Sequence, residues 1–156
     1  MWIKDLVDLI YFEHAIIRVR LSEVRDLMSE CEETAFRKLA EIHDLVVNWH
    51  AKIEDKYLFP LLPERTKPLS NDHRLIEKLG NSVIRERRKD WVSRYVDVVI
   101  NHNRNEEVLV LEDLRPLTSG LQKMGVKGAE SLTLPGRGWI APLYFKYFFF
   151  KISFNG

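Results

Sequence analysis

The spacing of apolar residues along the chain predicts four amphipathic helices. Apolar side chains recur at steps of three and four, which places them in a row, or seam, along one face of a helix. The first seam consists of Val7, Ile10, His14, Ile17, Leu21, Val24 and Met28, and further seams lie within residues 39–57, 73–84 and 92–109. Four such helices with short connections predict an all-α fold, an antiparallel up-down four-helix bundle.

Prolines and polar residues predict where these helices begin and end. Phe59-Pro60 is expected to end the second helix, and residues 61–68, which contain two further prolines, are expected to form a loop. Polar residues 70–72 are the expected cap of the third helix, and Asp90 is the expected cap of the fourth. Arg115-Pro116 marks the expected end of the fourth helix.

Four histidines occupy seam positions that would otherwise hold leucine. Two of them begin the pattern His-x-x-x-Glu, in His50 to Glu54 and in His102 to Glu106. A separation of four places both side chains on one helical face. Counted from the expected turns, six residues lie in one layer about one helical turn thick: His14 opposite His50, His73 opposite Glu106, and Glu77 opposite His102. Burying so many ionisable groups without a cation is costly, so the pattern predicts metal ligands.

The types of ligand favour a particular kind of metal centre. Imidazole suits iron, zinc and copper, whereas carboxylates favour harder ions and can bridge two of them. No histidine has a glutamate three residues before it, which disfavours the ferritin type of site. The His-Glu-x-x-His motif of zinc proteases is also absent. The mixture favours a di-iron or di-manganese carboxylate centre over a structural zinc site.

The ordered set of motifs resembles the hemerythrin family, including the HHE cation-binding domains. The matching segments cover about residues 5–117 and are Glu13–Arg18, His50–Pro60, Asn71–Leu75 and His102–Glu107. The resemblance implies a non-haem centre of two iron ions, Fe2+ or Fe3+, joined by an oxo or hydroxo bridge; other divalent metals stay open. It implies terminal ligands at His14, His50, His73 and His102, and bridging carboxylates at Glu54 and Glu106.

One position departs from the family pattern. The oxygen-carrying hemerythrins have a second histidine on the third helix, four residues after the first. In this chain that position is Glu77. We expect Glu77 to replace the histidine as a ligand; the alternative is that Glu77 points to solvent and one metal ion has an open or water-filled position.

Several polar residues lie near the predicted layer without matching the ligand motif. The candidates for contact with the ligands are His43, Tyr11, Tyr57 and Tyr95, for which packing in the core is the favoured role. Acidic residues directly beside the ligands in sequence are expected to be solvated, and these are Glu13, Asp55 and Glu107.

Composition excludes several classes of function. The net charge of +1 gives no basic surface for nucleic acid. The single cysteine excludes a disulfide framework and an all-cysteine metal site. Asp5 and Asp8 interrupt the apolar run that a signal peptide would need, so a cytoplasmic location is expected.

The bundle is predicted to span residues 1–117, followed by a different kind of segment in residues 118–156. Residues 118–138 hold five of the seven glycines and are expected to form a flexible connection. Residues 139–154 are densely aromatic, but two lysines and the short length argue against a transmembrane helix. This tail is expected to dock on the bundle; a homodimer contact or a membrane surface are the alternatives.

These observations predict a protein that binds or senses O2 or NO at a di-iron centre. A redox enzyme that reduces peroxide or NO on the same scaffold is an alternative, so enzymatic activity stays undecided. An iron-handling or signalling module is the other alternative.

Overall fold

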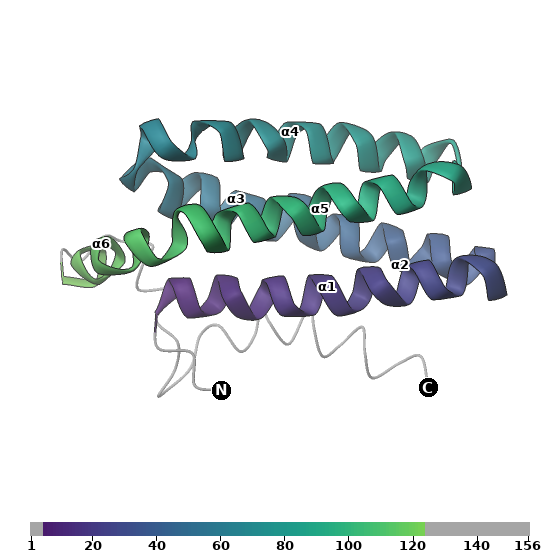
Figure 1. Cartoon of the computed structure of the whole chain (residues 1–156), viewed down its shortest axis with the longest axis horizontal. Helices are drawn as coiled ribbons and strands as arrows, with labels where there is room; N and C mark the ends of the chain where they lie inside the picture. Colours follow the sequence, from purple (N-terminus) through teal and green to yellow (C-terminus); the bar gives the residue numbers. More distant parts are fainter. Residues whose placement is uncertain (1–4, 124–156) are drawn as a thin grey trace.

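The computed structural model describes residues 5–123 of the chain, and within that range it contains helices and no strand. The longer helices are joined by very short connections (Figure 1). The elements in chain order are α1 (Leu6–Glu30), α2 (Glu32–Leu45), η1 (Val46–His50), α3 (Ala51–Ile53), η2 (Glu54–Leu58), η3 (Phe59–Leu61), α4 (Pro63–Arg85), α5 (Lys89–Leu109) and α6 (Leu111–Lys123). The prediction of an all-α fold is confirmed for the part of the chain that the structure describes.

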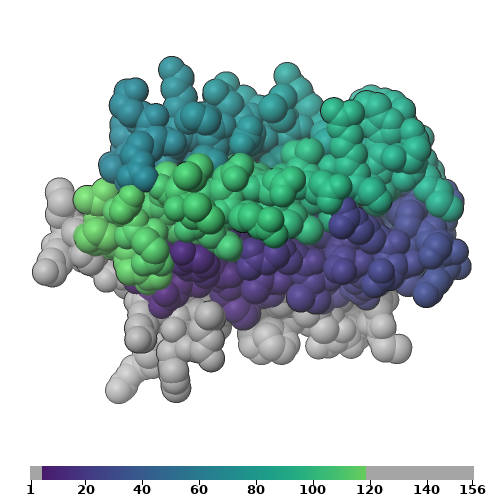
Figure 2. All heavy atoms as spheres, in the orientation of Figure 1, coloured from purple at the N-terminus to yellow at the C-terminus, as the bar shows by residue number. Residues whose placement is uncertain are grey.

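The helices form a bundle in which each long helix has two long neighbours. Helix α1 packs against α2 and α5, and α4 packs against α5 and α2. The space-filling view shows α5 lying between α4 and α1 on the visible face (Figure 2). Arg25 pairs with Asp97, and Arg18 pairs with Glu107. The later residue of α1, Arg25, thus lies beside the earlier residue of α5, Asp97. These two helices therefore run in opposite directions.

The apolar core is divided into two clusters with a polar layer between them. One cluster includes Ile17 on α1 and Val99 on α5. The other includes Ile10 on α1 and Val110 just after α5. His14 lies between Ile10 and Ile17 in sequence, and the buried polar residues of α5 lie between Val99 and Val110. The predicted layer of histidines and glutamates is thus enclosed by apolar side chains on both sides.

The predicted loop at residues 61–68 is wrong, because α4 already begins at Pro63. Proline suits the first position of a helix, where its missing N–H needs no partner. Pro68 lies in the second turn, where it removes one backbone hydrogen bond. The Thr66 hydroxyl donates to the carbonyl oxygens of Phe59 at 2.8 Å and Leu62 at 3.0 Å, which ties the start of α4 to the preceding helix.

The predicted end of the fourth helix at Arg115-Pro116 is also wrong. Helix α5 begins at Lys89 rather than after Asp90, and it ends at Leu109, where Val110 leaves helical geometry with φ −138° and ψ −31°. Helix α6 then passes through Pro116. Arg115 Nη1 donates to the carboxylates of Asp5 at 2.7 Å and Asp8 at 2.8 Å, which holds α6 against the start of α1.

Helix α6 also crosses the expected boundary at residue 117 and occupies the first part of the predicted flexible connection. The aromatic tail at residues 139–154 lies outside the described residues, so its docking or dimer contact stays a prediction. Across residues 5–123, no helix combines the length and the apolar run that crossing a bilayer requires.

Gly80 on α4 allows a close approach of α2 and α5. A Cβ atom at this position would overlap the ring of His43 and would lie 2.8 Å from Cε2 of Tyr95. The His43 ring is held on both sides, with Nδ1 2.8 Å from the Tyr95 hydroxyl and Nε2 3.2 Å from Oδ1 of Asn81. The ring therefore has little freedom to move away from an added methyl group.

Gly80→Ala is expected to destabilise the protein. Overpacking costs about 1–3 kcal/mol, which exceeds the gain of up to about 1 kcal/mol from replacing glycine by alanine in a helix. Urea unfolding followed by circular dichroism measures the change. Lys78→Ala, at an exposed position of the same helix, is the control. A midpoint for Gly80→Ala equal to or above the wild type would contradict the close packing.

Candidate metal centre

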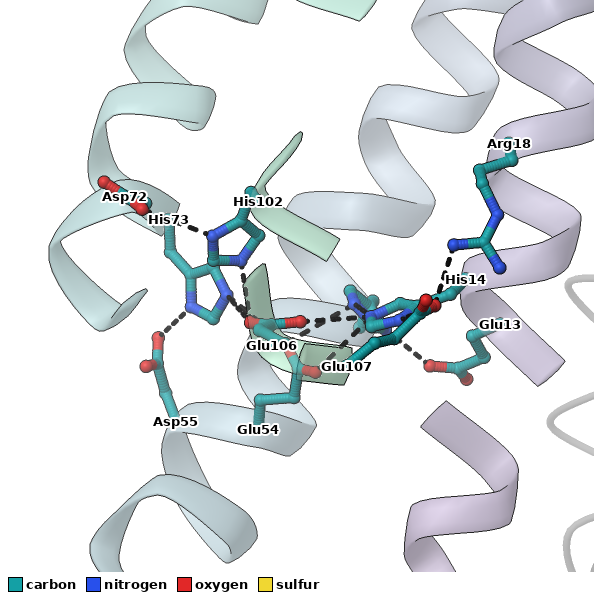
Figure 3. Close-up of polar contacts among 11 residues, drawn as sticks. Glu13, His14, Arg18, Glu54, Asp55, Asp72, His73, His102, Glu106 and Glu107 are labelled. Carbon is teal, nitrogen blue, oxygen red and sulfur yellow. Dashed lines mark hydrogen bonds and ion pairs between the residues drawn. The ribbon is translucent and has the colours of Figure 1, made fainter. Parts of the chain in front are cut away.

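Six of the seven predicted ligands come together in the layer between the two apolar clusters (Figure 3). All six are buried, and they come from every long segment of the bundle. They are His14 on α1, His50 in η1, Glu54 in η2, His73 on α4, and His102 and Glu106 on α5. Residues far apart in sequence are therefore gathered at one depth in the bundle. Counting from the turns predicted this depth for five of them, all except Glu54, but it also placed Glu77 in the layer, where Glu77 does not lie.

These residues form two groups whose geometry suits a metal ion. The first group contains the His14/His50 pair, the second contains the His73/His102 pair, and both contain Glu54 and Glu106. Within each group the candidate ligand atoms all lie within 4.8 Å of one another. The two carboxylates are thus shared between two pairs of imidazoles.

Each shared carboxylate contacts histidines of both pairs. Glu106 Oε2 lies 3.1 Å from Nε2 of His14, and its Oε1 lies 2.8 Å from Nε2 of His102. Glu54 Oε2 lies 3.4 Å from Nε2 of His50 and 3.3 Å from Nε2 of His73. In Figure 3, Glu54 and Glu106 lie at the centre, with His73 and His102 on one side and His14 on the other.

Two π-helical turns position the ligands of the second long helical segment. His50 is the last residue of η1, and Glu54 is the first residue of η2. The Ala51 N–H donates to the carbonyl of Val46, and the Phe59 N–H donates to that of Glu54, each five residues earlier. Such turns add a residue locally and are frequent at functional sites. The sequence shows no glycine or proline that would have predicted these turns.

Each of the four histidines has a second carboxylate at its other ring nitrogen. These outer carboxylates face the four Nδ1 atoms, while the Nε2 atoms face the centre. The pairs are His14 with Glu107 at 2.9 Å, His50 with Glu13 at 2.8 Å, His73 with Asp55 at 3.0 Å, and His102 with Asp72 at 3.5 Å. Such partners orient ligating histidines and increase their basicity.

The prediction that the acidic neighbours of the ligands are solvated is wrong for Glu13 and holds for the exposed side chain of Asp55, but the prediction missed that all of them face a histidine. Glu13 is buried, and Glu13, Asp55 and Glu107 all turn towards a histidine. Asp72 was expected only as a helix cap, and it lies 3.5 Å from Nδ1 of His102. Their signal in the sequence is that each directly adjoins a ligand. Their role was not predictable because each contacts a histidine of a different helical segment.

The hydrogen bonds leave a cluster of acceptors facing one another. Because Nδ1 of His14 and of His50 faces a carboxylate, it carries the proton, and the lone pair of each Nε2 points inward. These two Nε2 atoms are 3.2 Å apart. Two lone pairs at that distance need a proton or a cation between them. The donor set therefore fits a metal ion.

Unpartnered polar atoms mark the same place. Within residues 5–123, the buried side-chain nitrogens and oxygens without a hydrogen-bond partner belong to Glu54, His73, His102 and Glu106, with one exception, Nδ2 of Asn103. Buried polar groups of folded proteins are normally hydrogen-bonded. Their concentration here indicates that these atoms bind something other than the protein itself, and it supports the fit to a cation.

In the absence of metal, the electrostatics of the centre favour a charged Glu106 and protonated imidazoles at His50 and His73. Burial works to raise the pKa of Glu106, but the charge of His102 and the close contacts with His14 and His73 hold that pKa well below its usual range. Burial works to lower the pKa of His50, but the charge of Glu54 and the hydrogen bond to Glu13 raise it to about 9. The pKa of His73 is raised to about 12, because the hydrogen bond to Asp55 and other acidic contacts outweigh burial.

The structure does not bring Glu77 to the centre. Its side chain is exposed, and it belongs to neither of the groups found among residues 5–123. Its charge acts on His43 instead, whose pKa is lowered by burial and partly restored by Asn81 and Glu77.

The other predicted neighbours of the ligands lie outside the two groups as well. His43 and Tyr95 are buried and bonded to each other. Tyr57 is half-buried and packs against the apolar cluster that contains Ile10. Tyr11 is half-buried, packs against the same cluster and hydrogen-bonds to Glu112.

A helical bundle with buried histidines and glutamates that fit a cation defines a class of metal-binding protein. The family model of the hemerythrin HHE cation binding domain matches residues 5–114. The chain belongs to the hemerythrin family, which confirms the resemblance predicted from the motifs. Comparison with curated proteins and with solved structures gave no match.

Protein stripped of metal is expected to lose stability as pH rises from about 7 to 9.5. The folded pKa of His50, about 9, lies above its unfolded value of about 6.5. Its contribution is therefore complete below pH 6.5 and is lost as pH rises through 9. The raised pKa of His73 acts in the same direction at higher pH.

Urea unfolding at several pH values, with and without chelator, measures this dependence. The metal-loaded protein is expected to show a smaller loss, because the ion replaces the protons between imidazoles and carboxylates. His50→Gln is the matched variant, and its metal-stripped form is expected to lose less stability over the same range. Stability of the stripped wild type that rises with pH would contradict the expectation.

Proposed function

We propose that this protein binds or senses O2 or NO at a di-iron centre inside an antiparallel four-helix bundle. The observation that carries the proposal is the sharing of two buried carboxylates, Glu54 and Glu106, by two pairs of histidines. In this arrangement His14 and His50 would hold one ion and His73 and His102 the other, and Glu54 and Glu106 would be ligands available to both. Iron at such a centre supplies reversible redox chemistry and affinity for diatomic gases.

The mixture of ligands supports iron. Imidazole nitrogens suit iron and zinc, and bridging carboxylates suit harder ions. A structural zinc site would be closed by four ligands of one ion, whereas here two residues belong to both groups. Shared carboxylates of this kind are typical of two-ion centres.

The exposure of Glu77 supports an open coordination position. In the oxygen-carrying hemerythrins, a second histidine on the third helix adds a ligand to one ion. Here the equivalent residue is Glu77, which is exposed, so the His73/His102 group has no further ligand from α4, and each group consists of two imidazoles and the shared glutamates. The shared glutamates complete the protein ligands at both ions. This set leaves room for a small exogenous ligand, and apolar clusters lie on both sides of the layer along the bundle.

Protein purified without oxygen is expected to contain two iron ions per chain. Exposure to air or to NO is expected to produce a new absorption band, because the gas binds at iron. Metal analysis and an optical spectrum before and after exposure measure both. A reduced, iron-loaded protein without spectral response to either gas would exclude the proposed function. Repeated consumption of peroxide or NO with a reductant would instead indicate a redox enzyme.

The matched pair Glu77→Gln and Glu106→Gln tests the ligand set. Both remove one carboxylate charge, but Glu106 contacts both pairs of histidines and Glu77 is exposed. Glu106→Gln is expected to lower metal affinity by more than about tenfold, the loss typical of partners that merely support a ligand. Glu77→Gln is expected to keep the metal content and spectrum of the wild type. Loss of metal from Glu77→Gln would show that this residue is a ligand in solution.

A further inference from the structure

The outer carboxylates of the two histidine pairs differ in burial. Glu13 and Glu107, which serve the His14/His50 pair, have side chains 2% and 21% exposed. Asp55 and Asp72, which serve the His73/His102 pair, have side chains 39% and 41% exposed. The same difference extends to the histidines, because His14 and His50 are more completely buried than the other two.

The carboxylates of the His14/His50 pair are held in place by further hydrogen bonds. Glu13 accepts from Nε1 of Trp49 at 2.8 Å as well as from His50. Glu107 accepts from Nη1 of Arg18 at 2.7 Å as well as from His14. Both imidazoles of this pair are thus oriented by fixed carboxylates with little access to water.

The support of the His73/His102 pair is weaker. Asp55 accepts from Nδ1 of His73 at 3.0 Å and from the Ser70 hydroxyl. Asp72 lies 3.5 Å from Nδ1 of His102, which is an ion-pair distance without a hydrogen bond. Figure 3 shows Asp55 and Asp72 on the side of the cluster opposite to Glu13 and Arg18. Of these two imidazoles, only that of His73 is therefore hydrogen-bonded to its outer carboxylate.

These differences bear directly on metal affinity. Outer partners fix the orientation of ligating histidines and raise their basicity, and their loss typically lowers metal affinity by about 10–100-fold. Hydrogen bonds strengthen when they are buried, and water screens charge pairs that are exposed. A position whose outer carboxylates are less exposed and held by further hydrogen bonds therefore holds its ion more tightly than a position whose outer carboxylates are more exposed.

From this asymmetry we infer that the two ion positions are unequal. The position of the His14/His50 pair retains its ion, and the position of the His73/His102 pair exchanges its ion with the solution past Asp55 and Asp72. The inference rests on the proposed two-ion centre. It assigns Glu13 and Glu107 as positioning residues of the retained ion, and it makes occupancy of the second position follow the concentration of free metal.

Release of iron to a chelator tests this inequality. Protein is saturated with Fe2+ without oxygen, its iron content is measured, and a coloured ferrous chelator is added in excess. Two phases of equal amplitude are expected, with rates at least about tenfold apart. Release of both ions in a single phase would overturn the inference. Uptake of fewer than two ions at saturation would overturn the proposed two-ion centre instead.

Matched variants of the outer carboxylates assign the phases. Glu13→Gln and Glu107→Gln are expected to accelerate the slow phase by about 10–100-fold and to leave the fast phase near its wild-type rate. Asp55→Asn is expected to accelerate only the fast phase. Acceleration of the same phase by variants of both pairs would overturn the inference. Glu107→Gln, at a partly exposed position, keeps the test valid if Glu13→Gln does not fold, and circular dichroism reports folding.

Discussion

Two fully buried carboxylates, Glu54 and Glu106, impose the constraint on which the rest of this structure depends. A charge without compensation in an apolar interior would be neutralised or would unfold its surroundings. Here apolar clusters lie on both sides of the layer, so compensation must come from within it. The surrounding imidazoles provide this, either through protons on His50 and His73 or through bound cations. The bundle can therefore fold only if the histidines and glutamates of the centre come together.

The outer carboxylates extend this requirement to the register of the helices. Each adjoins a ligand in sequence but faces the histidine of the next long segment, since Glu13 faces His50, Asp55 faces His73 and Asp72 faces His102. Glu107 on α5 faces His14 on α1 and closes the ring. A shift of one helix by a turn, about 5.4 Å, would misplace its own ligand and also the carboxylate that orients its neighbour. These four contacts between neighbouring helices thus stabilise one relative position of the helices among those that the apolar seams allow.

Helical periodicity explains which features could be predicted from the sequence. It reports which side chains share a face of one helix, so the all-α fold and the six inner residues were predictable. Periodicity does not report which side chain of a neighbouring helix lies opposite. The role of Glu13 and the other outer carboxylates was therefore not predictable from it. The π turns around His50 and Glu54 depend on tertiary packing and leave no mark in the residue types. Pro63 and Pro68 suggested a loop, but the segment is helical, and its buried residues Thr66 and Leu69 pack in the bundle.

The exposed position of Glu77 follows from the spacing of the buried residues on α4. The buried residues of α4 advance from His73 by three to Ile76 and then by four to Gly80. On α5 they advance from His102 by four to Glu106. The same spacing of four therefore points inward on α5 and outward on α4. Because Ile76 occupies the inner position, Glu77 adds no ligand, and both histidine pairs share the same two carboxylates. Any inequality between them then comes from the outer carboxylates, whose burial is set by the packing of the helices rather than by the ligands themselves.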